Sequence, residues 1–169
     1  MASSAESAPS GDAVPRRRKK YVPAVTPRLR VVLVMVFGLF ALLAANSVYL
    51  ASITVLEAVT QKTYQDYFYL LNFLLHLVLG FLLLLPFTIF AFFHTLATMK
   101  RRNRVAVRMG YALLSVCVIL LVSGILLTRI AGIFELKQPF VRQAVYWAHV
   151  IAPLAGIWLY WLHRLAGPP

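Results

Sequence analysis

The 169-residue chain has a single cysteine, Cys117, and no Gly-x-Gly-x-x-Gly fingerprint for a dinucleotide. One cysteine excludes an internal disulfide, Cys-x-x-Cys zinc and redox sites, a Cys-x-x-Cys-His haem attachment and a cysteine-ligated iron–sulfur cluster. Cys117 lies among apolar residues, and we interpret it as a packing residue. The sequence therefore excludes several common redox chemistries.

Charge is also scarce, since only 13% of the residues are charged while 61% are hydrophobic. Soluble domains are about 25% charged and about 45–50% apolar, so the composition favours a membrane domain. Four uncharged runs each reach the roughly 20 residues that a helix needs to cross the hydrocarbon core. We predict an all-α fold, a four-transmembrane-helix bundle, with spans at about residues 31–56, 67–99, 107–133 and 143–165.

The remaining residues predict little further structure. Residues 1–27 are rich in Ala, Ser and Gly and then in Arg and Lys, so we expect a disordered basic tail. Residues 28–167 form the predicted membrane domain. Residues 168–169 are both proline, which is typical of the start of a linker, and we expect a longer natural protein.

Lysine and arginine are unevenly divided between the two sides of the predicted bundle. Thirteen fall on the side of the N-terminal tail, the 100–108 segment and Arg164, and four on the other side. Because positive residues mark cytoplasmic loops, we expect a multi-pass protein of a bacterial inner membrane with both termini cytoplasmic. The same rule explains the basic 101–104 run, so we expect a lipid bilayer and no nucleic acid as partner.

The four histidines lie only on the second and fourth predicted spans, where ionisable side chains are costly and usually functional. His76 and His94 are 18 residues apart, about five whole helical turns, and His149 and His163 are 14 apart, within about 40° of one face. Both spans run in the same direction. This places His76 opposite His149, and His94 opposite His163.

Two imidazoles that face each other at one depth are suited to ligate a haem iron from both sides. Gly80 and Gly156 share the histidine faces of their spans and would let a porphyrin approach the backbone. Haem propionates need cationic partners. Candidates for this role are Arg129 and Arg142 on the outer side and Lys100, Arg101, Arg104 and Arg164 on the inner side, and of these we single out Arg129 and Arg164.

Because two parallel spans each carry two histidines on one face, the chain resembles the di-haem b-type membrane cytochromes over about residues 28–167. Examples are the cytochrome b of quinol–cytochrome c oxidoreductases and the four-helix cytochrome b subunits of bacterial oxidoreductases. His149-x13-His163 has the family's usual spacing, whereas His76-x17-His94 is four residues longer. Pro86 lies between His76 and His94, and we expect a kink and tilt there to absorb the difference of roughly 6 Å.

The resemblance implies two bis-histidine haem b groups and electron transfer across the bilayer between a quinol and partner redox subunits. The chain would then be an electron-transfer subunit or domain of an oxidoreductase, and whether it is itself an enzyme stays open.

Two questions stay open at this point. The polar residues of the outer half are either ligands for a quinone headgroup or links between helices, and we favour links: Asn46, Ser47, Tyr49 and Asn72. The histidines, in turn, would serve only packing in a haem-free membrane scaffold or assembly subunit. A proton path or a non-haem metal is less favoured, because zinc sites usually include a carboxylate and residues 67–134 contain none.

Overall fold

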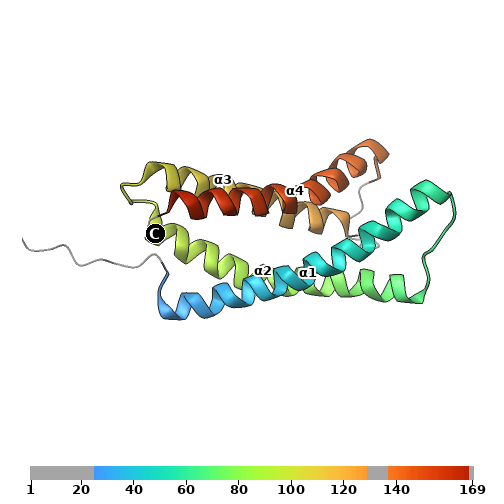
Figure 1. The fold of residues 1–169 in the computed structure, drawn as a ribbon, viewed down its shortest axis with the longest axis horizontal. Helices are drawn as coiled ribbons and strands as arrows, with labels where there is room; N and C mark the ends of the chain where they lie inside the picture. Colours follow the sequence, from blue (N-terminus) through green and yellow to red (C-terminus); the bar gives the residue numbers. More distant parts are fainter. Residues whose placement is uncertain (1–24, 129–136, 168–169) are drawn as a thin grey trace, which may run out of the picture.

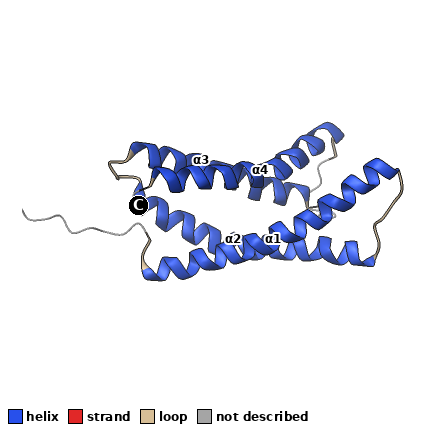
Figure 2. Ribbon diagram, in the orientation of Figure 1, coloured by secondary structure: helices blue, strands red, loops and turns tan. Residues whose placement is uncertain are grey.

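The computed structural model describes residues 25–128 and 137–167. Within them the chain forms four helices and no strand (Figure 2): α1 Pro27–Thr60, α2 Tyr67–Thr98, α3 Arg104–Leu127 and α4 Pro139–Ala166. At 1.5 Å per residue the helices are about 36 to 51 Å long, so each exceeds the roughly 30 Å of hydrocarbon in a bilayer. The all-α prediction with four candidate spans is confirmed.

The helices begin and end at capping residues rather than at the edges of the uncharged runs. The Thr26 side chain accepts a hydrogen bond from the Leu29 amide at 3.3 Å, so α1 starts before its two arginines. It ends at Thr60 and is capped by Gln61, which takes a left-handed conformation with φ 55°. Asp66 caps α2 through the Tyr69 amide at 2.8 Å. The spans predicted from charge alone were therefore shorter than α1 and α4.

The third span ends earlier than predicted. α3 stops at Leu127, and Thr128 is extended with ψ 127°. Residues 129–133 of the predicted span lie outside the described residues, as do residues 1–24 of the predicted tail and the predicted linker at 168–169.

The four helices form two antiparallel hairpins, α1–α2 and α3–α4, that lie side by side (Figure 1). The start of α1, the α2–α3 loop and the end of α4 meet at one end, which carries Arg28, Arg30, the 100–104 segment and Arg164. We call this the basic end, and the other the far end. The Asn103 side chain donates to the Ala166 carbonyl at 2.7 Å, so the loop is tied to α4.

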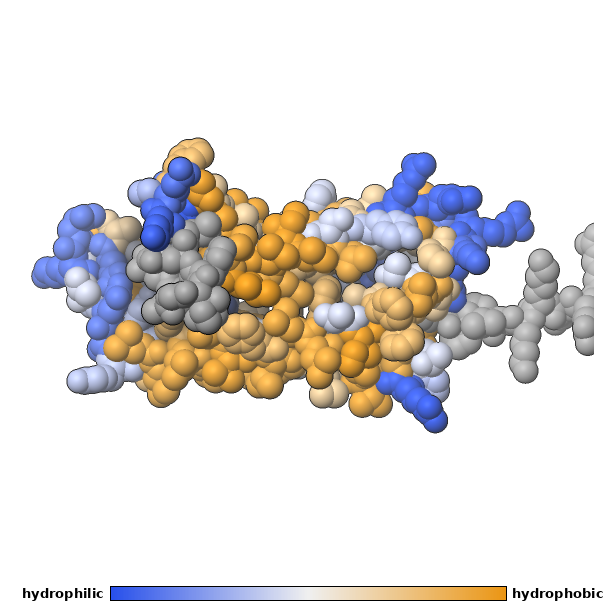
Figure 3. Space-filling model, turned by 180° about the vertical axis from the view of Figure 1, so that it is seen from behind, coloured by the Kyte–Doolittle hydropathy of each residue, from blue (hydrophilic) through white to orange (hydrophobic). Residues whose placement is uncertain are grey.

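Packing between the hairpins is sparse. α2 approaches α3, but among the described residues no Cα of α2 lies within 8 Å of a Cα of α4. The buried apolar residues are few: Leu29, Leu79, Leu83 and Ala152. Most large apolar side chains point outward instead, and Figure 3 shows them as a broad band between hydrophilic ends. Such a surface indicates contact with a lipid bilayer.

Candidate functional site

The four histidines meet in two pairs across the space between α2 and α4. The ring centroids of His76 and His149 are 6.1 Å apart, with ring planes at 79°. Those of His94 and His163 are 6.2 Å apart, at 82°. The pairing predicted from depth and helix direction is confirmed. The backbones of α2 and α4 are well separated, so the two helices meet through these imidazole side chains.

The distance within each pair distinguishes between two kinds of contact. Ring nitrogens lie about 1.15 Å from the ring centre, so the nitrogens of two partners are at least about 3.8 Å apart, beyond hydrogen-bond range. A metal–imidazole bond is about 2 Å long, so two imidazoles on opposite sides of one metal ion have centroids about 6 Å apart. Both pairs have a spacing that suits this second arrangement, and that an edge-to-face contact between two rings also has.

His149 is held by α3. Its Nδ1–H donates to the Leu120 carbonyl and to the Ser123 hydroxyl, each at 3.1 Å. The Ser123 hydroxyl itself donates to the Leu120 carbonyl at 3.0 Å, so its oxygen is available to accept. The proton is therefore on Nδ1, and Nε2 keeps its lone pair for a ligand.

His163 is held in the same way by a backbone group of α3. Its Nδ1–H donates to the Ala106 carbonyl at 3.1 Å. The acceptor is again a carbonyl, so this imidazole also presents Nε2 as its lone-pair nitrogen.

His76 is held by α1. Its Nδ1–H donates to Oδ1 of Asn46 at 3.2 Å and lies 3.4 Å from the Ser47 hydroxyl, which donates to the Leu43 carbonyl. The amide nitrogen of Asn46 donates to the backbone and side-chain oxygens of Asn72, both at 3.1 Å, which orients Oδ1 towards the histidine. Three of the four histidines thus share one tautomer. His94 stacks on Phe90 at 5.1 Å.

These contacts also bear on the polar residues of α1 and α2. Asn46 and Ser123, the two buried polar residues of the described chain, both contact a far-end histidine. Asn46 links α1 to α2, and Tyr49 packs against the Phe68 ring at 5.2 Å. The interpretation of these residues as links between helices agrees with the geometry.

Two glycines of α3, which the sequence did not single out, allow the histidines of α4 to approach. A Cβ on Gly124 would lie 3.0 Å from Cε1 of His149, and one on Gly110 would lie 3.3 Å from Cε1 of His163. The two glycines are 14 residues apart, as are the two histidines they contact. That matched spacing was a signal in the sequence.

The glycines predicted from the histidine faces have more open surroundings. A Cβ on Gly80 would meet nothing within 4 Å, and one on Gly156 would meet only Val116, at 3.9 Å. Their proposed role, close approach of a porphyrin, stays a prediction. Of the two predicted propionate partners, Arg164 is exposed at the basic end, and Arg129 lies outside the described residues.

The unequal spacing of the histidines along the chain is accompanied by a bend in α2. Along straight helices His76 and His94 would be about 27 Å apart, and His149 and His163 about 21 Å apart. Figure 1 shows α2 bending midway along its length. Pro86, inside this helix, lacks the N–H that would bond one turn back, which favours a bend.

Across residues 25–128 and 137–167, no three His, Cys, Asp or Glu side chains gather as a metal site. The histidines meet in twos, which is the number of protein ligands that a bis-histidine haem takes. Comparisons with protein-family models, curated proteins and solved structures found no match for this chain. The case for a function therefore depends on the site itself.

Proposed function

We propose that this chain is a membrane cytochrome that holds two b-type haems, one between His76 and His149 and one between His94 and His163. The single observation that carries the proposal is the recurrence of one ring spacing, 6.1 and 6.2 Å, in both pairs. That spacing suits two imidazoles on one iron and is too long for a direct hydrogen bond.

The residues around each pair fit this role. Nδ1–H donation by His76, His149 and His163 leaves Nε2 as the ligating nitrogen and restrains the plane of each ring. Gly110 and Gly124 let the imidazoles of α4 lie against α3. The apolar helices keep water from the sites, which lowers the local dielectric constant.

Bound haem would supply one-electron redox chemistry, and the chain would supply ligands, ring orientation and surroundings. With one pair near each end of the bundle, the function is electron transfer across the bilayer between a quinol and partner redox subunits. The basic end would face the cytoplasm of a bacterial inner membrane, with both termini on that side. The chain is then a subunit or domain of an oxidoreductase.

An optical spectrum of the full chain, purified from haem-replete cells, tests the proposal. We expect sharp bands on reduction with dithionite and two haems per chain by haem extraction. The quadruple variant with all four histidines changed to alanine is the control and should be colourless. A colourless wild-type protein would instead favour the haem-free scaffold, and one haem per chain would reduce the proposal to a single site.

A further inference from the structure

We propose that the seam between α1 and α4 admits haem to the bundle from the bilayer, and that Phe37 and Tyr160 form a gate across this seam. The inference rests on the proposed function and adds to it the route by which the sites are loaded. Phe37 and Tyr160 are separate from the histidine ligands and from the groups that hold those ligands.

The seams between neighbouring helices are closed to different extents. α1 packs closely on α2, where Asn46 is hydrogen-bonded to Asn72, and α3 packs closely on α4. His149 and His163 add hydrogen bonds from α4 to carbonyls of α3. Between α1 and α4, by contrast, no two Cα atoms of the described residues lie within 8 Å of each other. The α1–α4 seam therefore has the looser packing.

The connections between the helices leave the same seam able to open. Residues 99–103 join α2 to α3, and through them one hairpin to the other. The Asn103 side chain fastens this loop to the Ala166 carbonyl at the end of α4. α1 and α4 are the first and last of the four helices, so the chain does not connect them directly. Rotation of one hairpin about the 99–103 loop therefore widens the α1–α4 seam and leaves both hairpins intact.

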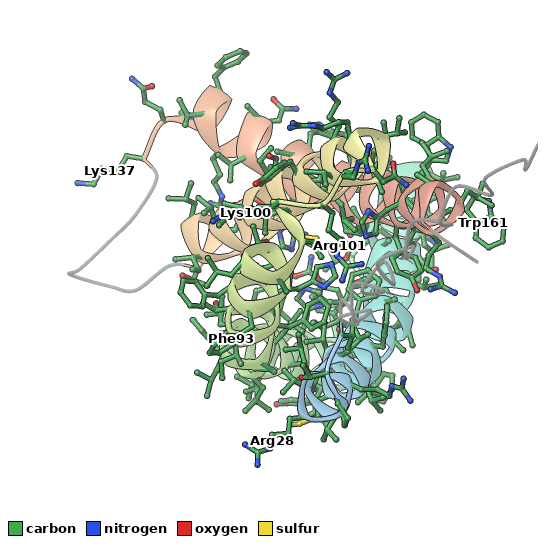
Figure 4. All side chains as sticks on the ribbon, turned by 90° about the vertical axis from the view of Figure 1, so that its left-hand side faces the viewer. Arg28, Phe93, Lys100, Arg101, Lys137 and Trp161 are labelled. Carbon is green, nitrogen blue, oxygen red and sulfur yellow. The ribbon has the colours of Figure 1, made fainter. Side chains whose placement is uncertain are left out.

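An aromatic contact spans the seam. The rings of Phe37 in α1 and Tyr160 in α4 meet edge to face, with centroids 5.4 Å apart and planes at 70°. Phe37 is 41% exposed and Tyr160 36%, so the pair lies at the surface that faces the bilayer. Figure 4 looks along the bundle from the basic end and shows α1 and α4 on the same side of it, with Trp161 pointing outward. An edge-to-face pair is weak enough to open reversibly.

The gate lies beside the basic-end site. Tyr160 precedes His163 by three residues, which is about 4.5 Å along the axis of α4. His163 is turned towards α3, where it donates to the Ala106 carbonyl, whereas Tyr160 is turned towards α1. Separation of the Phe37 and Tyr160 rings therefore opens the space beside His163 to the hydrocarbon layer. That layer dissolves a flat apolar porphyrin, which makes it a suitable source.

A cross-link between α1 and α4 tests the route. Phe37→Cys and Tyr160→Cys are combined in a Cys117→Ala chain, produced in haem-deficient cells, reconstituted into vesicles and joined by a cleavable bismaleimide. Haem b is added, and the growth of the bound-haem spectrum gives the rate of uptake. We expect the cross-link to slow uptake by about 10- to 100-fold relative to the same chain before cross-linking, because the hairpins no longer separate. Cleavage of the cross-linker should restore the rate. Transfer of bound haem to apomyoglobin should be slowed by the same factor, since it uses the route in reverse.

The α1–α2 seam supplies a matched control. The rings of Tyr49 and Phe68 also meet edge to face there, with centroids 5.2 Å apart and planes at 76°. A cross-link between Tyr49→Cys and Phe68→Cys joins helices of one hairpin and should leave the rate of uptake unchanged. Phe37→Ala should speed uptake about 2- to 10-fold, as for the loss of one edge-to-face pair, whereas Phe68→Ala should not. The final spectrum should be the same in all these variants, because their ligands are intact.

Two results would overturn the inference. The first is uptake by the α1–α4 cross-linked chain at the rate seen before cross-linking. The second is equal slowing by the α1–α2 cross-link, which would indicate a general effect of stiffening the bundle. A chain that binds no haem, cross-linked or not, would overturn the proposed function along with this inference, so the two failures are distinguishable.

Discussion

The far-end histidines have side-chain acceptors in addition to a backbone carbonyl, whereas His163 at the basic end contacts a backbone carbonyl, although the ring spacings of the two pairs are nearly equal. At the far end, His76 and His149 contact the side chains of Asn46 and Ser123, both buried. At the basic end, His163 donates to a backbone carbonyl, which no substitution removes directly. The far-end site should therefore be the one that is sensitive to changes in its polar neighbours.

Ser123→Ala tests that sensitivity. It removes one of the two acceptors of the His149 Nδ1–H and leaves the Leu120 carbonyl, so we expect about tenfold weaker haem retention at the far-end site. Ser52→Ala is the matched control, because Ser52 also donates to a carbonyl of its own helix but is exposed. Equal effects of the two substitutions on haem transfer would contradict the role of Ser123.

The four histidines should separate into two spectral classes. His76→Ala and His149→Ala should each abolish the same low-temperature absorption band, because each removes one ligand from one haem. His94→Ala and His163→Ala should abolish the other band, since the sites share no ligand. The measurement is the reduced-minus-oxidised spectrum of each single variant. Grouping of His76→Ala with His163→Ala would contradict the pairing.

Residue spacing was sufficient to predict the pairs but not their hydrogen-bond partners. The pairing follows from distances along α2 and α4 and from their shared direction, all of which are readable in the sequence. Asn46 was expected in the same half of the bundle as His76, where the structure has it, but its contact with His76 depends on the rotation of α1 about its own axis. The polar residues of α1 are too few to determine that rotation.

The helices differ in what they contribute to the site. α2 and α4 supply the imidazoles, whereas α1 and α3 supply the groups that hold them. Within α3, Gly110 and Gly124 are 14 residues apart. Gly110 lies against His163 of α4, and Gly124 lies against His149. The sequence indicated Gly80 and Gly156 because they share a face with histidines. The spacing of residues along one helix identifies the face that carries the histidines, but it does not identify the residues of a neighbouring helix that pack against that face.

A graded series of Gly→Ala variants tests the role of α3. The added Cβ lies 3.0 Å from His149 at Gly124, 3.3 Å from His163 at Gly110, and more than 4 Å from any neighbour at Gly38. We expect Gly124→Ala to displace its imidazole most and to weaken the far-end haem, with Gly110→Ala having a smaller effect on the other haem. Gly38→Ala should leave both spectra unchanged and stabilise α1 by about 0.5–1 kcal/mol. A reversed order in haem retention would contradict the contacts described here.

At the scale of the whole molecule, the bundle consists of two hairpins with histidines between them. Composition predicted the four spanning helices, because apolar runs of this length have few other stable structures in a lipid environment. The division into hairpins follows from packing between neighbouring helices, which apolar composition on all sides does not specify. Similarly, the bend in α2 was expected from Pro86, but its extent depends on how α2 packs.

Single-cysteine labelling tests the orientation of the bundle. In a Cys117→Ala background, Lys62→Cys should react with a membrane-impermeant maleimide in intact cells, and Arg102→Cys should react only after the membrane is opened. The reason is the concentration of lysine and arginine at the basic end, which favours the cytoplasmic side. The opposite pattern of labelling would place the basic end outside.

With the proposed haems bound, the depth of the two histidine pairs would make electron transfer between them responsive to the membrane voltage. The pairs are separated along α4 by about 21 Å of a hydrocarbon layer of about 30 Å, so an electron moving between them crosses about 70% of the membrane field. A potential of 100 mV is worth about 2.3 kcal/mol for a full crossing, and therefore about 1.6 kcal/mol here. In proteoliposomes, a potassium diffusion potential of 100 mV should shift the apparent difference between the two haem midpoint potentials by about 70 mV, reversing sign with the polarity. The membrane voltage would then shift the distribution of the electron between the haem at the basic end and the haem at the far end.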